Sequence, residues 1–239
     1  MKLKFIIDLD YEKVMLLHFL RNDQPRMKPL IDDWLARGIL PNIKVIKTSR
    51  LEKILDELIA GDFLILKKYL VSTQKSYQSH WDEINNTFFC TTEKITGFSW
   101  KHPKYECVVS LYHVGISNWG GPKIARIWKE NPFTMRKITA HELLISHFFT
   151  IFNSHYIYFK ISDREKWSLA EIFSWCLTGL EADMIKLWPW IMVHEKYPLN
   201  HNYPQLINWQ KKIKNIYLKK QDFESFIEDS IRIIRKYPY

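Results

Sequence analysis

The stretch from Asn131 to Phe152 most constrains what this chain can fold into. Asn131 followed by Pro132 offers a helix N-cap and then proline at the first helical position, which predicts a helix start. The residues that follow are helical in pattern and very apolar to about Phe152. Glu142 falls in the middle of this segment, where a carboxylate is costly unless it has a charged or metal partner. The sequence therefore predicts an apolar helix that carries a polar site.

Composition bounds the class of protein. Of the 239 residues, 46% are hydrophobic and 26% are charged, which excludes an intrinsically disordered protein. A chain of this length holds a core without disulfides, and the cysteines at 90, 107 and 176 form no CxxC pair. Neither a disulfide framework nor a cysteine zinc site is expected. The start has no signal-peptide pattern and no stretch reaches the ~18 apolar residues of a membrane helix, so we expect a soluble, cytoplasmic protein.

The chain is predicted to form one domain, because no linker or internal repeat interrupts it. Residues 1–95 are expected to form a mainly helical scaffold. Residues 96–200 are expected to hold the active-site region, and residues 201–239 to form C-terminal helices.

The predicted fold class is α+β, mostly helical, with a small sheet packed against the apolar helix. Residues 106–114 are rich in β-formers and predict a strand, and a short first strand is expected within 2–8. Residues 115–121 contain three of the seven glycines, which indicates a turn or a close approach of the backbone. Further helices are expected at 10–21, 28–37, 49–59, 62–81, 168–187, 204–219 and 222–236.

The run His-Glu-Leu-Leu-Ile-Ser-His at 141–147 resembles the zinc-binding helix of zincin metallopeptidases. In that family the motif HExxH places two zinc-binding histidines on one helix face, and its glutamate activates the bound water. In the gluzincin branch the third ligand is a glutamate on the next helix, which matches Glu171 here. The resemblance covers roughly residues 105–185. It implies a zincin-like fold, Zn²⁺ as cofactor and a peptide substrate lying along an edge strand, which residues 106–114 would supply.

The second zinc ligand departs from the family motif. The position that requires histidine holds Ile145, and the available histidine is His147, six residues after His141. On a regular helix the side chains of residues 141 and 147 point about 120° apart and lie about 9 Å apart along the axis. Zinc–nitrogen bonds of about 2.0–2.1 Å cannot span that separation unless the helix is distorted, for instance by a π-bulge. The alternatives are a distorted helix, another ligand such as His155, or no metal.

The resemblance implies a role for each matching residue. His141, His147 and Glu171 would hold zinc, and Glu142 would be the catalytic base that takes a proton from the zinc-bound water. Other candidates are the transition-state stabilisers His194, Tyr197 and His201 and the substrate-binding residues His113 and Trp119.

Both glutamates also have a purely structural interpretation. The segments 139–142 and 168–171 each match a capping box, in which the glutamate only bonds back to the start of its own helix. A helix start at Asn131 weakens this interpretation for Glu142. His147, taken alone, is more often a hydrogen-bonded core histidine than a metal ligand.

Three functions stay open at this point. The first is a zinc metallopeptidase, a hydrolase acting on a peptide or protein substrate. The second is a metal-free zincin-like protein that binds proteins or peptides, which Ile145 favours. The third and weakest is a nucleic-acid-binding protein, suggested by the net charge of +9. Because the lysines are spread along the chain and mixed with acids, we expect neither nucleic acid nor a membrane as partner.

Overall fold

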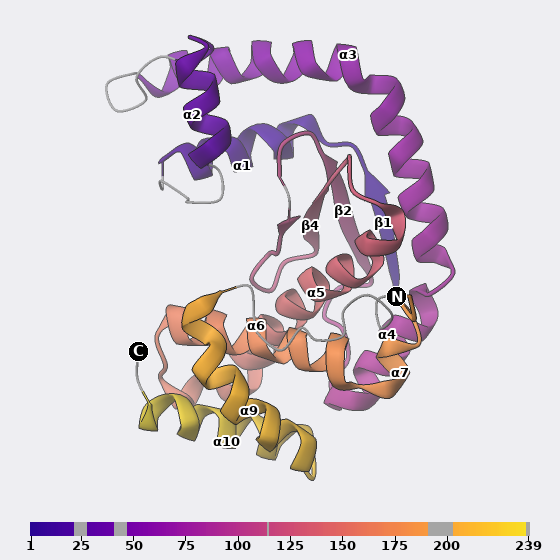
Figure 1. Ribbon diagram of the computed structural model, residues 1–239, viewed down its shortest axis with the longest axis vertical. Coiled ribbons are helices and arrows are strands. Elements are labelled where there is room, and N and C mark those ends of the chain that lie inside the picture. The colour runs from indigo at the N-terminus through magenta and orange to yellow at the C-terminus, as the bar shows by residue number, and fades with distance from the viewer. Residues whose placement is uncertain (22–27, 41–46, 114, 191–202, 238–239) are drawn as a thin grey trace.

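A small mixed sheet lies at the centre of the fold (Figure 1). The computed structural model describes residues 1–21, 28–40, 47–113, 115–190 and 203–237. The sheet has the order β1-β2-β4-β3, in which β1, β2 and β4 are parallel and β3 is antiparallel to β4. The strands are β1 (Lys2–Ile6), β2 (Lys104–Ser110), β3 (Gly115–Ile116) and β4 (Lys123–Ile127).

The position of β2 corrects one expectation. The strand expected at 106–114 was assigned to an edge of the sheet, but β2 pairs with β1 on one side and with β4 on the other. Its residues Cys107, Val108 and Val109 are all buried, as is typical of a parallel strand covered on both faces. The edge beside β4 is formed instead by β3, the short strand in the glycine-rich segment.

Helices from the first third of the chain cover one face of the sheet and its β1 edge. Helix α1 (Leu9–Arg21) packs on the face that carries Val108, and α2 (Lys28–Ala36) follows it. Helix α3 (Thr48–Asp82) is one continuous helix, where the sequence predicted two. Figure 1 shows it crossing the top of the molecule and bending down beside β1, where α4 (Asn85–Thr96) follows.

Side chains of α3 occupy the outer edge of β1. Gln78 accepts a hydrogen bond from the Phe5 amide (2.8 Å), and Gln74 donates one to the Phe5 carbonyl (2.8 Å). Asn85 of α4 accepts from the Leu3 amide (3.1 Å). The β1 edge is therefore closed by the protein itself.

The apolar helix α5 (Pro132–Ile151) begins where the sequence predicts. The Asn131 side chain accepts a hydrogen bond from the Phe133 amide (2.9 Å), and Pro132 takes the first helical position. A π-helical turn, η1 (Phe152–Tyr156), and a 3₁₀ turn, η2 (Ile157–Phe159), follow it.

Helix α6 (Asp163–Leu180) lies beside α5 and continues into the short α7 (Ala182–Ile185). Ser162 and Glu165 form the capping box at its start. Glu142 and Glu171 therefore lie in the middle of their helices, and the capping-box interpretation is wrong for both.

The chain ends in a helical hairpin of α9 (Ile207–Lys219) and α10 (Phe223–Lys236), preceded by the 3₁₀ turn η3 (Pro204–Leu206). Its buried faces join the main core, which runs from Leu3 to Ile234. The predicted α+β class, mostly helical with a small sheet against the apolar helix, is confirmed. Within the described ranges, no helix combines the length and apolarity that crossing a membrane requires.

Candidate functional site

Helices α5 and α6 bring His141 and Glu171 into contact. The imidazole Nε2 lies 3.1 Å from Glu171 Oε2, and the other ring nitrogen, Nδ1, lies 2.8 Å from the Ser174 hydroxyl. Ser174 donates its own proton to the His141 carbonyl (3.0 Å), so its oxygen is left to accept from Nδ1–H. Both ring nitrogens therefore face acceptors, an arrangement that suits the doubly protonated imidazolium.

The electrostatics of His141 agree with this geometry. Burial alone would lower the pKa of the imidazole, but the hydrogen bond and charge of Glu171, with the charge of Glu142, outweigh it. The pKa of His141 is therefore raised. Glu171 and Glu142 are both buried, and this strengthens their attraction to the imidazolium.

A second group joins Glu142 to the sheet. Arg126 of β4 is only 2% exposed, and its guanidinium donates to Glu130 through Nε (3.0 Å) and Nη2. The remaining nitrogen, Nη1, lies 3.9 Å from Glu142 Oε1. Arg126 thus fixes the carboxylate of Glu142 on the β4 side of the site.

Gly115 of β3 makes room for this group. It pairs with Arg126 across the strands, and a Cβ placed on it would lie 2.5 Å from Arg126 Nη1 and 2.7 Å from Glu142 Oε1. The close approach predicted for the glycine-rich segment is confirmed at this residue. Arg126 and Glu130 were missed by the sequence analysis, although an arginine inside the apolar strand Ile-Ala-Arg-Ile is a signal of a buried acidic partner.

His147 lies elsewhere. Its side chain is fully buried, its ring stacks on Trp100 (centroids 4.2 Å apart), and its Nε2 lies 3.4 Å from the Thr96 hydroxyl. Burial lowers the pKa of His147 to about 3, so the ring is neutral. His155, the alternative ligand, packs its ring on Phe98 instead.

The helix between His141 and His147 is regular. Helix α5 runs without a break to Ile151, and the π-helical turn begins only at Phe152. The expected kind of distortion exists, but it lies beyond His147 and cannot turn that residue toward His141. The residue four positions after His141 is Ile145, which is buried.

The residues fit a zinc ion only in part. Two tetrahedral ligands with zinc bonds of about 2.0–2.1 Å lie roughly 3.3 Å apart, close to the 3.1 Å between His141 and Glu171. His147 does not join this pair. Across the described residues, no three or more His, Cys, Asp or Glu side chains are grouped so that they could hold a metal. His141, His147 and Glu171 therefore cannot bind one zinc ion together. No chemical step is derived through a zinc ion at this site.

The remaining candidates differ in accessibility. His113 is 1% exposed and lies against Phe19 of α1, with its Nε2 3.7 Å from Glu12 Oε1, so it cannot touch a substrate in this conformation. Trp119, between β3 and β4, is 51% exposed, and its ring stacks flat on Phe149 (4.7 Å between centroids). The expected stabilisers His194, Tyr197 and His201 lie outside the described residues.

Comparison with protein families, with curated proteins and with solved structures finds no match to this chain.

Proposed function

We propose that this chain is a zincin-like protein that binds an extended peptide segment along β3. The observation that carries the proposal is the place of β3, which ends the sheet directly beside the carboxylate of Glu142. An edge strand offers backbone N–H and C=O groups to a partner in extended conformation. Since Gln74 and Gln78 occupy the opposite edge, β3 is the edge that a peptide can extend.

The side chains around β3 suit such a ligand. Gly115 packs closely against Arg126 and Glu142, so these two charged groups lie at β3 itself. Trp119 offers an exposed ring for an apolar side chain of the peptide. His141, whose side chain is 23% exposed, and Glu142 supply charged groups of both signs for polar groups of the bound segment.

We propose binding without hydrolysis because of Ile145 and His147. Ile145 holds the position of the second histidine, and the stacking of His147 on Trp100 assigns it to the core. His141 already has acceptors for both ring nitrogens, so it must give up Glu171 as a hydrogen-bond partner before it can bind a metal.

A zinc metallopeptidase is the second candidate function. It is favoured by one observation, the 3.1 Å separation of His141 Nε2 and Glu171 Oε2, which matches two ligands of one ion. In that function Glu142 is the candidate base that the resemblance implies, and its carboxylate lies 3.9 Å from Arg126 Nη1. Either function belongs in a reducing compartment such as the cytoplasm, where the thiols of Cys90, Cys107 and Cys176 stay unpaired.

Peptide binding is tested by screening a random peptide library against the immobilised full chain and measuring the hits by fluorescence anisotropy. Trp119→Ala should weaken the hits at least tenfold, while Tyr69→Ala, an exposed ring on α3, serves as the matched control. Equal affinities for both variants would overturn the placement of the peptide on β3.

Elemental mass spectrometry separates the two functions. Protein purified without chelator should contain far less than one zinc per chain if the ligand set is incomplete. The peptidase function would be supported instead by two results together. Wild-type protein would contain about one zinc per chain that is lost in His141→Ala, and it would cleave a bound peptide in a reaction that Glu142→Gln abolishes. Retention of zinc in His147→Ala would then leave His141 and Glu171 as its ligands.

A further inference from the structure

A strip of alternating aromatic and basic side chains crosses the end of the C-terminal hairpin. It consists of Tyr158, Phe159, Arg235, Lys236, Tyr237 and Lys212, and we call it the aromatic–basic strip. These residues come from η2, the end of α10 and the start of α9, which Figure 1 places together near the C-terminus. The strip lies away from the site on α5 and is independent of it.

Contacts between neighbours hold the strip together. Arg235 donates a hydrogen bond to the Phe159 carbonyl and lies over the Phe159 ring, which in turn lies 4.5 Å from Tyr158. Lys212 Nζ lies 3.9 Å from the centre of the Tyr237 ring, and Lys236 Nζ lies 5.6 Å from it.

The rings at both ends of the strip are accessible. Tyr158 is 58% exposed and Tyr237 is 39% exposed, although the Trp209 indole anchors the Tyr237 carbonyl through a hydrogen bond of 2.6 Å. Because its backbone is already fixed, an exposed ring of this kind loses little conformational freedom when a ligand stacks on it.

Positive charge predominates at this end of the hairpin. Residues 207–214 at the start of α9 contain three lysines and no acid, and residues 230–237 contain three basic residues and no acid. The acids of α10 lie nearer its start, where Glu228 and Asp229 pair with Arg232. Near η2, Asp163 pairs with Lys166 and Glu165 accepts a hydrogen bond from the Ser162 hydroxyl, while the charges of Glu224 and Glu228 act on Tyr156.

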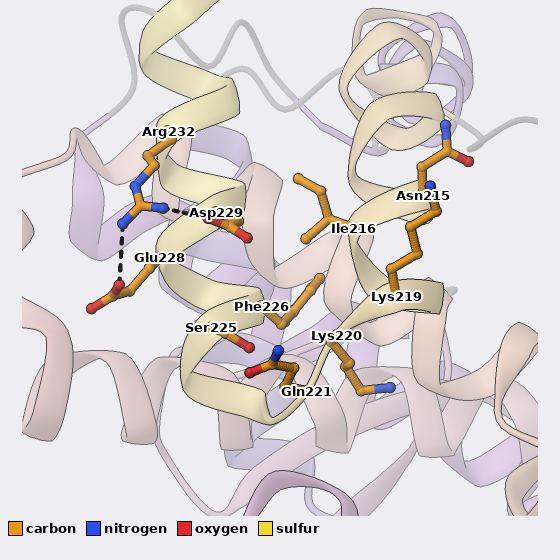
Figure 2. A pocket seen from close by; sticks show the side chains of 10 residues that line it. All are labelled: Asn215, Ile216, Lys219, Lys220, Gln221, Ser225, Phe226, Glu228, Asp229 and Arg232. Atoms are coloured by element: carbon orange, nitrogen blue, oxygen red, sulfur yellow. Dashed lines mark hydrogen bonds and ion pairs between the residues drawn. The ribbon is translucent and has the colours of Figure 1, made fainter.

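The cavity between α9 and α10 is a contrasting case. It measures about 550 Å³ and is lined by Lys219, Lys220 and Arg232 (Figure 2). Figure 2 shows Arg232 bonded to Glu228 and Asp229, and Lys220 is bonded to Glu181 (2.9 Å). Since three acids offset its three basic residues, this cavity offers an anion far less than the strip does.

We propose that the aromatic–basic strip binds single-stranded nucleic acid. Lysine and arginine side chains attract the phosphates, and exposed tyrosine rings stack on unpaired bases, which is how sequence-tolerant single-strand binding works. A base that stacks on Tyr237 displaces a lysine from the ring face, and that lysine is then free to pair with the next phosphate. A duplex keeps its bases stacked on each other and uses only the charges.

The test measures the anisotropy of a short fluorescent single-stranded DNA of mixed sequence with the full chain. If the three basic residues of the strip each contact a phosphate, the affinity should fall roughly twentyfold between about 50 and 200 mM salt, given a slope of about −0.7 per phosphate on single strands. The double variant Lys212→Glu, Lys236→Glu should bind at least tenfold more weakly. Its control is Lys68→Glu, Lys75→Glu on α3, which makes the same charge change at exposed positions.

The ring variants separate stacking from charge. Tyr158→Ala with Tyr237→Ala should weaken single-strand binding by roughly fivefold or more, as expected for the loss of base stacking, and leave the weaker duplex binding unchanged. Circular dichroism checks that each variant is folded. Equal losses in the strip and α3 charge variants, ring variants that bind like wild type, or binding only to phosphatidylserine vesicles would each overturn the proposal.

Discussion

The substitution Gly115→Ala tests the geometry of the candidate site most directly. The added methyl group would lie 2.5 Å from Arg126 Nη1 and 2.7 Å from Glu142 Oε1, both far inside van der Waals contact. Glu142 is buried beside Arg126, and Arg126 is itself buried and held by two hydrogen bonds to Glu130. The clash must therefore disturb a buried ion pair.

The magnitude follows from two opposing effects. Overpacking a buried site costs about 1–3 kcal/mol, whereas alanine restricts the unfolded chain and returns about 0.4–1 kcal/mol. We expect a net loss of about 1–2 kcal/mol in the free energy of unfolding, which corresponds to a fall in Tm of roughly 2–8 °C for a chain of this size.

Urea denaturation measures this loss, provided that the m value is unchanged. Gly61→Ala in α3 is the matched control, because nothing lies within 4 Å of its Cβ position and the change should stabilise the helix by about 0.5–1 kcal/mol. In a Glu142→Ala background Gly115→Ala should cost less, since one of its two close contacts is gone. If Gly115→Ala is as stable as Gly61→Ala, Arg126 and Glu142 do not lie against β3 as described.

Three further predictions concern the two helices of the site. Ile145→His places a histidine four residues after His141, and elemental analysis should show the zinc content rising toward one per chain; an unchanged content would contradict the zincin-like geometry. Glu171→Gln removes the charge that raises the pKa of His141, so NMR titration should show a lower pKa in the variant. The His141–Glu171 pair stabilises the fold at low pH, and this stabilisation is lost as the pH rises through the raised pKa of His141. Stability without that pH dependence would refute the ion pair. His147→Ala should lower the free energy of unfolding by about 3–5 kcal/mol, as aromatic truncations do, without changing the zinc content. Because the pKa of His147 is about 3 in the folded state, wild-type stability should fall as the pH drops below about 6.5, and this fall should be smaller in the variant.

Local features of the fold were predictable from sequence. The start of α5 at Asn131 and Pro132 is set by capping within one helical turn, and the sequence contains both residues needed for it. The mismatch between His141 and His147 was predictable for the same reason, because a regular helix fixes the angle between residues six apart. The structure keeps α5 regular there, so the expected separation remains.

Two expectations from the sequence are wrong, and both concern places where distant segments meet. The sequence predicts a break between two helices at Gly61, but α3 passes through it because buried residues before and after that point support one long helix. The resemblance to zincins implies an edge strand at residues 106–114, and a run of β-formers by itself says nothing about how many neighbours a strand has. Only the pairing of β2 with β1 and β4 makes it central.

The sequence by itself determined the helical apolar segment with its His-Glu pair, the glycine at β3 and the missing histidine at 145. Each depends on residues within a few positions of one another, where backbone geometry leaves little choice. Tertiary structure alone decided that Arg126 reaches Glu142, that His147 stacks on Trp100, and that Lys212 of α9 and Arg235 of α10 meet the rings of Tyr237 and Phe159. These contacts join segments far apart in the chain, and they form only when the whole core packs.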